Sequence, residues 1–274
     1  MNFSIHSIQT YAFVGGGQMA EALIRGLLAG ELAMPDSILV AEPDPARREV
    51  LQTTYGVRCT DSPEEAARFG RILVLAVKPQ LAAEVMAQYR PWMTGQHLVL
   101  SIMAGVPLAS LAAGLGETMR LIRVMPNTPA LVLAGATVFS ANALATAEDR
   151  TAATTLFSVI GTCDEVPEHL MDAVTGLSGS GPGYVFTFIE ALIDGGVLAG
   201  LPRSLAERLV VQTVYGSAKM ALETGEPAAV LKARVTSPGG TTIAGIRVLE
   251  QGGLRGTVMA AVETATHRSR ELGA

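Results

Sequence analysis

Short apolar segments alternate with helical patterns in the first half of the chain. Five of these segments are rich in β-branched and apolar residues without strict alternation, as expected of strands covered by helices on both faces. They cover residues 11–14, 37–41, 72–77, 98–102 and 121–124. Strands separated by helices are typical of βαβ units in a parallel sheet. The pattern therefore predicts a doubly wound α/β domain over residues 1–145.

Helical periodicity dominates the second half of the chain. Thr146, followed by Glu148 and Asp149, is a typical helix start. Further helices are predicted over residues 167–175, 182–199, 203–224, 227–235, 241–251 and 254–272, so we expect an all-α C-terminal domain over residues 146–274. The two long helices from Pro182 onward carry few charges. Other helices must therefore cover them, either from the same chain or from a second subunit.

Composition and charge exclude several classes of protein. A hydrophobic share of 49% with 16% charged residues excludes a disordered chain. The tightly apolar stretches fall far short of the ~20 residues that span a bilayer, so no membrane partner is expected. A net charge of −5 without a basic block argues against a nucleic-acid partner. Two cysteines, four scattered histidines and no secretion signal predict a cytoplasmic protein without disulfide or metal site.

A glycine-rich turn follows the first predicted strand. Gly15, Gly17 and Ala20 fit the pattern G-x-G-x-x-A, with Gln18 and Met19 between them, and a helical pattern begins directly afterwards. In this pattern the first glycine allows a tight turn, the second lets the backbone approach a pyrophosphate, and the small third residue allows close packing. Glycine also serves many strand-to-helix turns that bind nothing. Its place before a series of βα units favours a dinucleotide site in a Rossmann-type domain.

Glu42 ends the second predicted strand, where an acidic residue accepts hydrogen bonds from the adenosine ribose hydroxyls. A carboxylate there repels the 2′-phosphate of NADPH. An equally good interpretation is that Glu42 and Asp44 cap the next helix. Arg47 and Arg48 follow closely and would suit a 2′-phosphate instead. These residues leave NADH and NADPH both open.

Two further loops follow predicted strands at the carboxyl edge of the sheet, where open α/β sheets bind ligands. Val77, Lys78 and Pro79 end the third strand, and Asn127 and Thr128 lie between two prolines after the fifth. An amide and a hydroxyl in such a rigid loop suit a nicotinamide carboxamide. Turn chemistry alone also explains Asn beside Pro, but the position favours the binding role.

A second candidate site lies in the helical half. The segment 237–240, Ser-Pro-Gly-Gly, precedes a predicted helix that begins with two threonines. Such a turn presents successive backbone N–H groups at a helix N-terminus, which hold a carboxylate without Arg or Lys. Ser and Thr are also ordinary N-caps, so the segment taken alone predicts a helix start more often than a substrate site.

The segment from Val235 to Glu250, V-T-S-P-G-G-T-T-I-A-G-I-R-V-L-E, resembles the signature of the pyrroline-5-carboxylate reductase family. Other blocks resemble that family in the same order over nearly the whole chain: residues 15–20, 76–79, 101–106, 125–129 and 172–182. Gly183 and Gly245 stand where the family more often has alanine, and Glu42 is less usual at its position. The departure at Glu42 weakens the case for NADPH.

The resemblance implies reduction of 1-pyrroline-5-carboxylate to L-proline, the last step of proline synthesis, by hydride from NADPH or NADH. It implies a homodimer or higher oligomer, with Thr242 orienting the imine nitrogen or relaying a proton to it. The expected substrate-binding residues are Ser237, Gly239, Gly240, Thr241 and Thr242. The expected cofactor-binding residues are Gly15, Gly17, Gln18, Met19, Ala20, Glu42, Val77, Lys78, Pro79 and Asn127.

Two other functions share parts of this pattern. A β-hydroxyacid dehydrogenase carries a catalytic lysine after G-x-x-G-x-G, but that pattern, placed on Gly176, Gly179 and Gly181, puts Val185 at the lysine position. A nucleotide-binding sensor without turnover would share the fold, because fold does not dictate function. The serine- and threonine-rich loop before residue 243 argues against the sensor, and an assay of cofactor oxidation with the imine separates the two.

Overall fold

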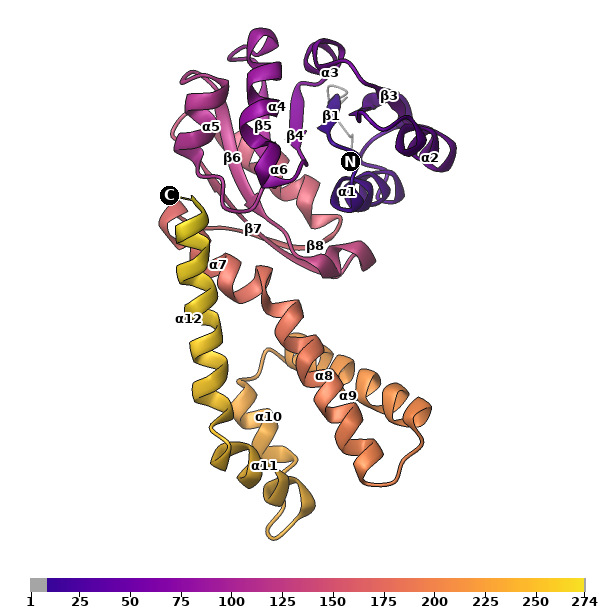
Figure 1. The fold of residues 1–274 in the computed structure, drawn as a ribbon, viewed down its shortest axis with the longest axis vertical. Helices are drawn as coiled ribbons and strands as arrows, with labels where there is room; N and C mark the ends of the chain where they lie inside the picture. The colour runs from indigo at the N-terminus through magenta and orange to yellow at the C-terminus, as the bar shows by residue number, and fades with distance from the viewer. Residues whose placement is uncertain (1–8, 274) are drawn as a thin grey trace, which may run out of the picture. The chain divides into compact units, whose positions relative to one another are not determined.

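The structure is a computed structural model that describes residues 9–273. The chain divides into two compact units: the residues up to Ser180 together with those from Thr264 onward, and Gly181–Glu263 between them. The first unit contains an eight-stranded sheet with the order β3-β2-β1-β4-β5-β6-β7-β8 (Figure 1). All neighbouring strands are parallel except β6 and β7. The predicted Rossmann-type, doubly wound domain is confirmed.

All five predicted strands are confirmed, with ends that shift by two residues or fewer. They are β1 (Tyr11–Val14), β2 (Ile38–Ala41), β4 (Ile72–Leu75), β5 (Leu98–Ser101) and β6 (Arg120–Met125). Three strands were not predicted: β3 (Arg58–Thr60), β7 (Gly135–Ala141) and β8 (Gly161–Glu165). β3 and β8 are the two edges of the sheet and are partly exposed, so they lack the apolar run that marks a covered strand.

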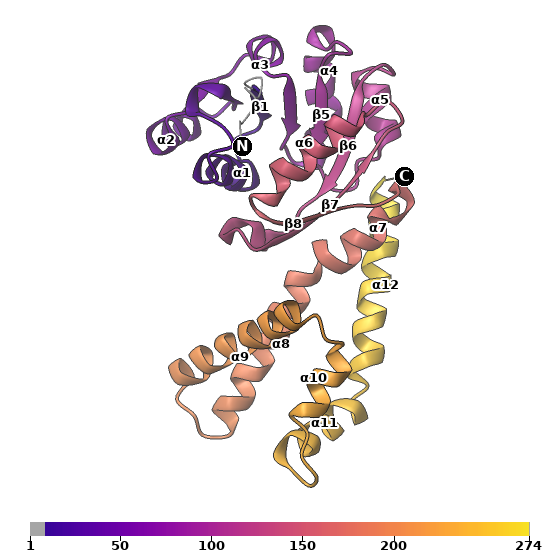
Figure 2. The same cartoon turned by 180° about the vertical axis from the view of Figure 1, so that it is seen from behind.

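Helices cover both faces of the sheet. Along β1, Tyr11 and Phe13 pack in one apolar cluster, while Ala12 and Val14 pack in the other. The first cluster is covered by α1 (Gln18–Ala29), α2 (Pro45–Tyr55) and α6 (Ala147–Ser158), and Figure 2 shows α6 on this face. The second is covered by α3 (Pro63–Phe69), α4 (Ala82–Tyr89) and α5 (Leu108–Leu115). Successive side chains of β1 point to opposite faces of the sheet, and both faces are covered. The sequence of β1 is therefore apolar throughout.

The first unit extends beyond the predicted boundary at residue 145. The capping box of Thr146 and Asp149 starts α6 as expected, but Leu156 and Phe157 of that helix are buried against the sheet. β8 then pairs with β7 in parallel. The expected all-α C-terminal domain is confirmed, but it begins after Ser180 and not at residue 146, because α6 and β8 complete the sheet layer. α7 (Met171–Val174) and a π-helical turn, Thr175–Gly179, still belong to this unit.

The second unit is helical, and the ends of its helices lie close to those predicted. It contains α8 (Gly181–Leu198), α9 (Arg203–Thr224), α10 (Ala228–Arg234), α11 (Thr241–Gln251) and the first part of α12 (Leu254–Gly273). Within residues 181–263, all of which the structure describes, Ala206 alone is buried. Large apolar side chains such as Phe186 and Leu198 are 62% and 91% exposed. Among residues 9–273, no helix is long and apolar enough to cross a membrane.

Thr137 on β7 generates a prediction about stability. It is 1% exposed and its hydroxyl has no hydrogen-bond partner, whereas the buried Thr60 hydroxyl donates to Glu65 at 2.6 Å. An unpaired buried hydroxyl costs about 1–3 kcal/mol. Thr137→Val should therefore raise the free energy of unfolding by about 1 kcal/mol, and the matched Thr60→Val should lower it by a similar amount. Urea titrations at one protein concentration measure both; destabilisation by Thr137→Val would contradict the assignment.

Candidate active site

The glycine turn between β1 and α1 has the geometry expected of a pyrophosphate site. Gly15 has a φ of +98°, its N–H donates to Ala41 O at 2.8 Å, and a Cβ there would lie 2.8 Å from Ala76 O. Only glycine fits such a position. Gly17 is the N-cap of α1, and a Cβ there would meet nothing within 4 Å. The space in front of Gly17 is open to a ligand, while the fully buried Ala20 packs below it.

The turn lies where the order of strands reverses. β1 pairs with β2 on one side and with β4 on the other, so crossovers leave β1 in opposite directions. Ligands of open α/β sheets bind at the carboxyl ends of strands at this switch point. A cavity of about 460 Å³ lies there, lined among others by Gly15, Gly17, Glu42, Val77 and Lys78. The structure thus brings five of the predicted cofactor residues together.

Two more of the predicted residues are the first helical residues of α1. Gln18 and Met19 follow the N-cap Gly17 directly. The N–H groups of a first helical turn have no partner within the helix, and the helix dipole favours an anion in front of them. Gln18 is exposed and Met19 is half-buried, so this end of α1 is accessible. The arrangement suits a phosphate group held by backbone N–H groups.

Glu42 has a role that neither interpretation of the sequence contained. Its Oε2 accepts a hydrogen bond from Gly16 N at 2.8 Å, and its Oε1 accepts one from Asp44 N at 3.0 Å. The cap of α2 is Asp44, which accepts from Ala46 N at 2.9 Å. Glu42 therefore supports the glycine turn and also lines the cavity. A carboxylate accepts several hydrogen bonds, so it can still receive a ribose hydroxyl.

Both arginines after Glu42 are engaged within the protein. Arg47 donates to Gly16 O at 2.6 Å and forms an ion pair with Glu21, to which Tyr55 also donates at 2.8 Å. The hydrogen bond from Arg47 is the largest cause that lowers the pKa of the Glu21 carboxyl. Arg48 donates to the backbone oxygens of Glu42 and Pro43 at 2.7 and 2.9 Å. In this arrangement neither guanidinium is free for a 2′-phosphate.

A second cavity at the carboxyl ends of the strands has a volume of about 430 Å³. It is lined by loops after β4 and β5, including Pro79 and Gly105, and by Thr175 and Ser180 of the π-helical region. Thr175, Ser180 and Gly105 were not predicted as site residues, although each lies in a block that resembles the family. β4 and β5 follow β1 in the sheet, so these loops lie on the side of the switch point away from Glu42.

Asn127 has two partners inside the first unit. Its Nδ2 donates to Ser178 O at 3.0 Å, and its Oδ1 accepts from Ala136 N at 2.8 Å. The amide thereby ties the loop after β6 to β7 and to the π-helical turn. These contacts favour a structural role for Asn127 over direct binding of the carboxamide.

The loop before α11 forms a tight turn in the helical unit. Gly240 N donates to Ser237 O at 3.1 Å, and Gly239, with a φ of +67°, occupies the third position of this turn. A preceding Pro238 and a positive φ at the third position are typical of a type II turn. Gly240 is the N-cap of α11, and no side chain caps that helix. The first N–H groups of α11 are therefore available to an anion, and Thr241 and Thr242 are exposed beside them.

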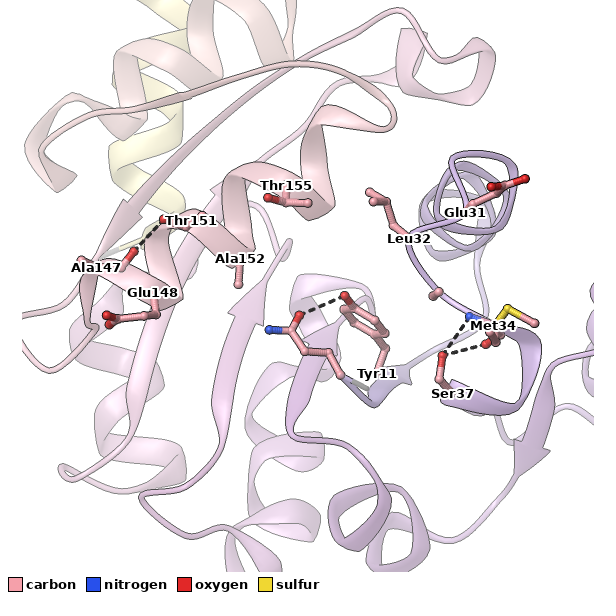
Figure 3. A pocket seen from close by; sticks show the side chains of 12 residues that line it. Tyr11, Glu31, Leu32, Met34, Ser37, Ala147, Glu148, Thr151, Ala152 and Thr155 are labelled. Atoms are coloured by element: carbon pink, nitrogen blue, oxygen red, sulfur yellow. Dashed lines mark hydrogen bonds between the residues drawn. The ribbon is translucent and has the colours of Figure 1, made fainter. Parts of the chain in front are cut away.

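Other features of the described residues offer no competing chemistry. Burial raises the pKa of the Cys163 thiol to about 11, so it is protonated near neutral pH. Among residues 9–273 no cluster of His, Cys, Asp or Glu suits a metal ion. A cavity of about 580 Å³ lies at the amino end of β1, away from the glycine turn (Figure 3). Tyr11 and Thr151 in its wall hydrogen-bond to Gln9 and Ala147, so their polar groups are satisfied internally.

Comparisons with known proteins agree with this geometry. Residues 168–272 match the family described as pyrroline-5-carboxylate reductase dimerisation, and residues 10–105 match the family described as NADP oxidoreductase, coenzyme F420-dependent. The chain is 50% identical to the pyrroline-5-carboxylate reductase of Synechocystis over 260 residues, which cover 95% of this chain and 97% of the relative. It is 42% identical to that of Escherichia coli over 260 residues, with the same shares covered.

Solved structures give the same result. A pyrroline-5-carboxylate reductase from Coxiella burnetii is 35% identical with a TM-score of 0.93, covering 98% of this chain and 100% of that one. The Plasmodium falciparum pyrroline carboxylate reductase with NADP bound is 34% identical with a TM-score of 0.88, covering 99% of this chain and 100% of that one. The open glycine turn, the uncapped helix at Gly240 and these matches lead to one conclusion. The chain belongs to the pyrroline-5-carboxylate reductase family.

Proposed function

We propose that this chain reduces 1-pyrroline-5-carboxylate to L-proline with NADH or NADPH as hydride donor, in the cytoplasm. One observation supports the proposal beyond family membership: two helices begin at a glycine with no side-chain cap, so each can offer backbone N–H groups to an anion. One follows Gly17 at the switch point of the sheet, and the other follows Gly240 in the helical unit. A dinucleotide needs the first, and a small carboxylate needs the second.

The first unit supplies the cofactor site. Gly17, Gln18 and Met19 present N–H groups to the pyrophosphate, and Glu42 addresses the adenosine ribose. The loops with Lys78 and Gly105 extend the site toward the nicotinamide. The adenosine and nicotinamide halves are assigned to different loops because the two halves of a dinucleotide bind on opposite sides of the switch point of the sheet.

The second unit supplies the substrate site. N–H groups from Thr241 onward hold the carboxylate at the positive end of α11, and the Ser237 hydroxyl lies close to Gly240. Bound NADH or NADPH would supply hydride for the imine carbon, so the chain's own task is to hold the ring and to support the nitrogen as it gains an electron pair. Thr242 orients that nitrogen or relays a proton from water, since a hydroxyl is too weak an acid to protonate it alone.

Self-association completes the helical unit. The matched family model is a dimerisation domain, and residues 181–263 bury only Ala206 within the chain. An apolar helical surface of this extent needs a cover. We infer a homodimer or a larger oligomer in which α8 and α9 of two copies cover one another.

The substrate loop generates the first test. Thr242→Ala should lower kcat and kcat/KM together by about 10- to 100-fold, because the hydroxyl acts as nitrogen gains electron density. Gly240→Ala should chiefly raise KM for the imine, since its Cβ would lie 2.3 Å from Ser237 Oγ. Its φ of −74° suits any residue, so the effect is steric. The control is Gly245→Ala, where a Cβ meets nothing within 4 Å.

Steady-state kinetics with NAD(P)H and the imine measure these variants. Wild-type protein that binds NAD(P)H but does not oxidise it with the imine would reject the reductase in favour of a sensor. Unchanged kinetics in both Thr242→Ala and Gly240→Ala would reject the site.

Glu42 generates a test of cofactor choice. Glu42→Gln removes the charge but keeps an oxygen that can accept the Gly16 N–H. Relief of repulsion at a partly solvated site is worth about 1 kcal/mol, so the ratio of kcat/KM for NADPH over NADH should rise about fivefold. If this ratio stays constant, Glu42 supports the turn without selecting the cofactor.

The exposed helices generate a test of assembly. Phe186→Glu places a charge on the apolar surface of α8 and should dissociate the oligomer, because a buried unpaired charge is costly. Met34→Glu is the control, since Met34 is similarly exposed, 71% against 62%, but lies in the first unit. Light scattering at micromolar concentration measures the mass. An active wild-type monomer would overturn the inference.

A further inference from the structure

The peptide groups on either side of Gly16 are held by two side chains from the second βα unit. Glu42, at the end of β2, accepts from Gly16 N at 2.8 Å. Arg47, on α2, donates from Nε to Gly16 O at 2.6 Å. The middle residue of the glycine turn is therefore fixed through both its donor and its acceptor. Glycine residues have more backbone conformations available than other residues, so an ordered glycine-rich turn loses more conformational entropy. The two hydrogen bonds at Gly16 select one of these conformations.

The bond from Arg47 also determines where the next N–H points. Gly16 C=O and Gly17 N–H belong to one planar peptide unit. Among residues 9–273 no peptide bond is cis, so the two groups of this unit point in opposite directions. Arg47 holds the carbonyl on the α2 side of the turn. The N–H of Gly17 therefore points away from α2. The space at Gly17 is open, since a Cβ there would meet no atom within 4 Å.

Arg47 is itself held in position. Glu21 on α1 pairs with its guanidinium and receives a second hydrogen bond from Tyr55 at 2.8 Å. The side chains of Arg47 and Glu21 are 25% and 29% exposed, so the pair is largely shielded from water. Because Glu21 balances its charge, Arg47 offers orientation rather than net attraction to a phosphate.

We propose that Arg47 is a positioning residue for the dinucleotide: through Gly16 O it aims Gly17 N–H at the pyrophosphate, with Glu21 as its anchor. The proposal rests on the proposed cofactor site. It differs from the role that the sequence suggested for Arg47, a direct contact with the 2′-phosphate. The two roles separate cleanly, because NADH and NADPH share the pyrophosphate and only NADPH has the 2′-phosphate.

The test compares binding of NADH and NADPH to the full-length protein without imine, by nucleotide fluorescence. Arg47→Met should raise both Kd values by about tenfold, by the same factor, since a charge-assisted hydrogen bond that orients the turn is lost. With saturating cofactor, kcat should stay within about twofold, because the turn does not touch the reacting atoms. The matched control is Arg58→Met, which removes an arginine that pairs with Glu65 outside the site and should leave both Kd values unchanged.

A second variant tests the anchor. Glu21→Gln keeps Arg47 but weakens its support, so both Kd values should rise by a smaller equal factor. In the double variant the loss should not exceed that of Arg47→Met, because both changes act on one contact. Should Arg47→Met fail to fold, Arg47→Lys serves instead, because one ammonium group cannot replace the two directed contacts.

Two results would overturn the proposal. Weaker binding of NADPH alone would mean that Arg47 contacts the 2′-phosphate. A lower melting temperature with unchanged Kd values would mean that the ion pair only stabilises the packing of α1 on α2. Failure of the reductase assay leaves this test intact, because binding is measured without the imine.

Discussion

The cofactor end of this protein depends on the close approach of β1 and the strand beside it at Gly15. A side chain at Gly15 would lie 2.8 Å from Ala76 O, and the N–H of Gly15 is already bonded to Ala41 O on the other neighbouring strand. The chain must therefore turn sharply at this point, between two strands that leave no room. That constraint places the start of α1 over the switch point of the sheet. The other contacts of the turn then fix the directions of its peptide groups.

The buried part of the fold was predictable because burial leaves a pattern in the sequence. β1, β2, β4 and β5 are covered on both faces and consist of apolar runs. β8 has the sequence G-T-C-D-E and lies at a partly exposed edge, so its membership depends on pairing with β7 rather than on its own composition. For the same reason the boundary of the first unit could not be found: α6 has an ordinary helical sequence and becomes part of the sheet layer only through packing.

The candidate site was predictable in position but not in its internal contacts. The spacing of the glycines together with their place between a predicted strand and a helix located the glycine turn, and the family signature located the loop before α11. The partners of Arg47 lie 26 and 31 residues away along the chain, on α1 and in the turn, so only the folded chain reveals them. Asn127 shows the converse: its residue type suggested a ligand contact, while its amide joins segments that are 9 and 51 residues distant.

The near absence of a core in the helical unit links folding to concentration. A unit that buries one alanine gains little hydrophobic stabilisation by itself, so most of its free energy of folding must come from association. Dilution then acts on this unit as a denaturant would, while the sheet unit, with its own two apolar clusters, stays folded. Nucleotide binding to the sheet unit should therefore outlast the helical unit as the protein is diluted, and in a newly made chain the helical unit becomes stable only after it meets a second copy.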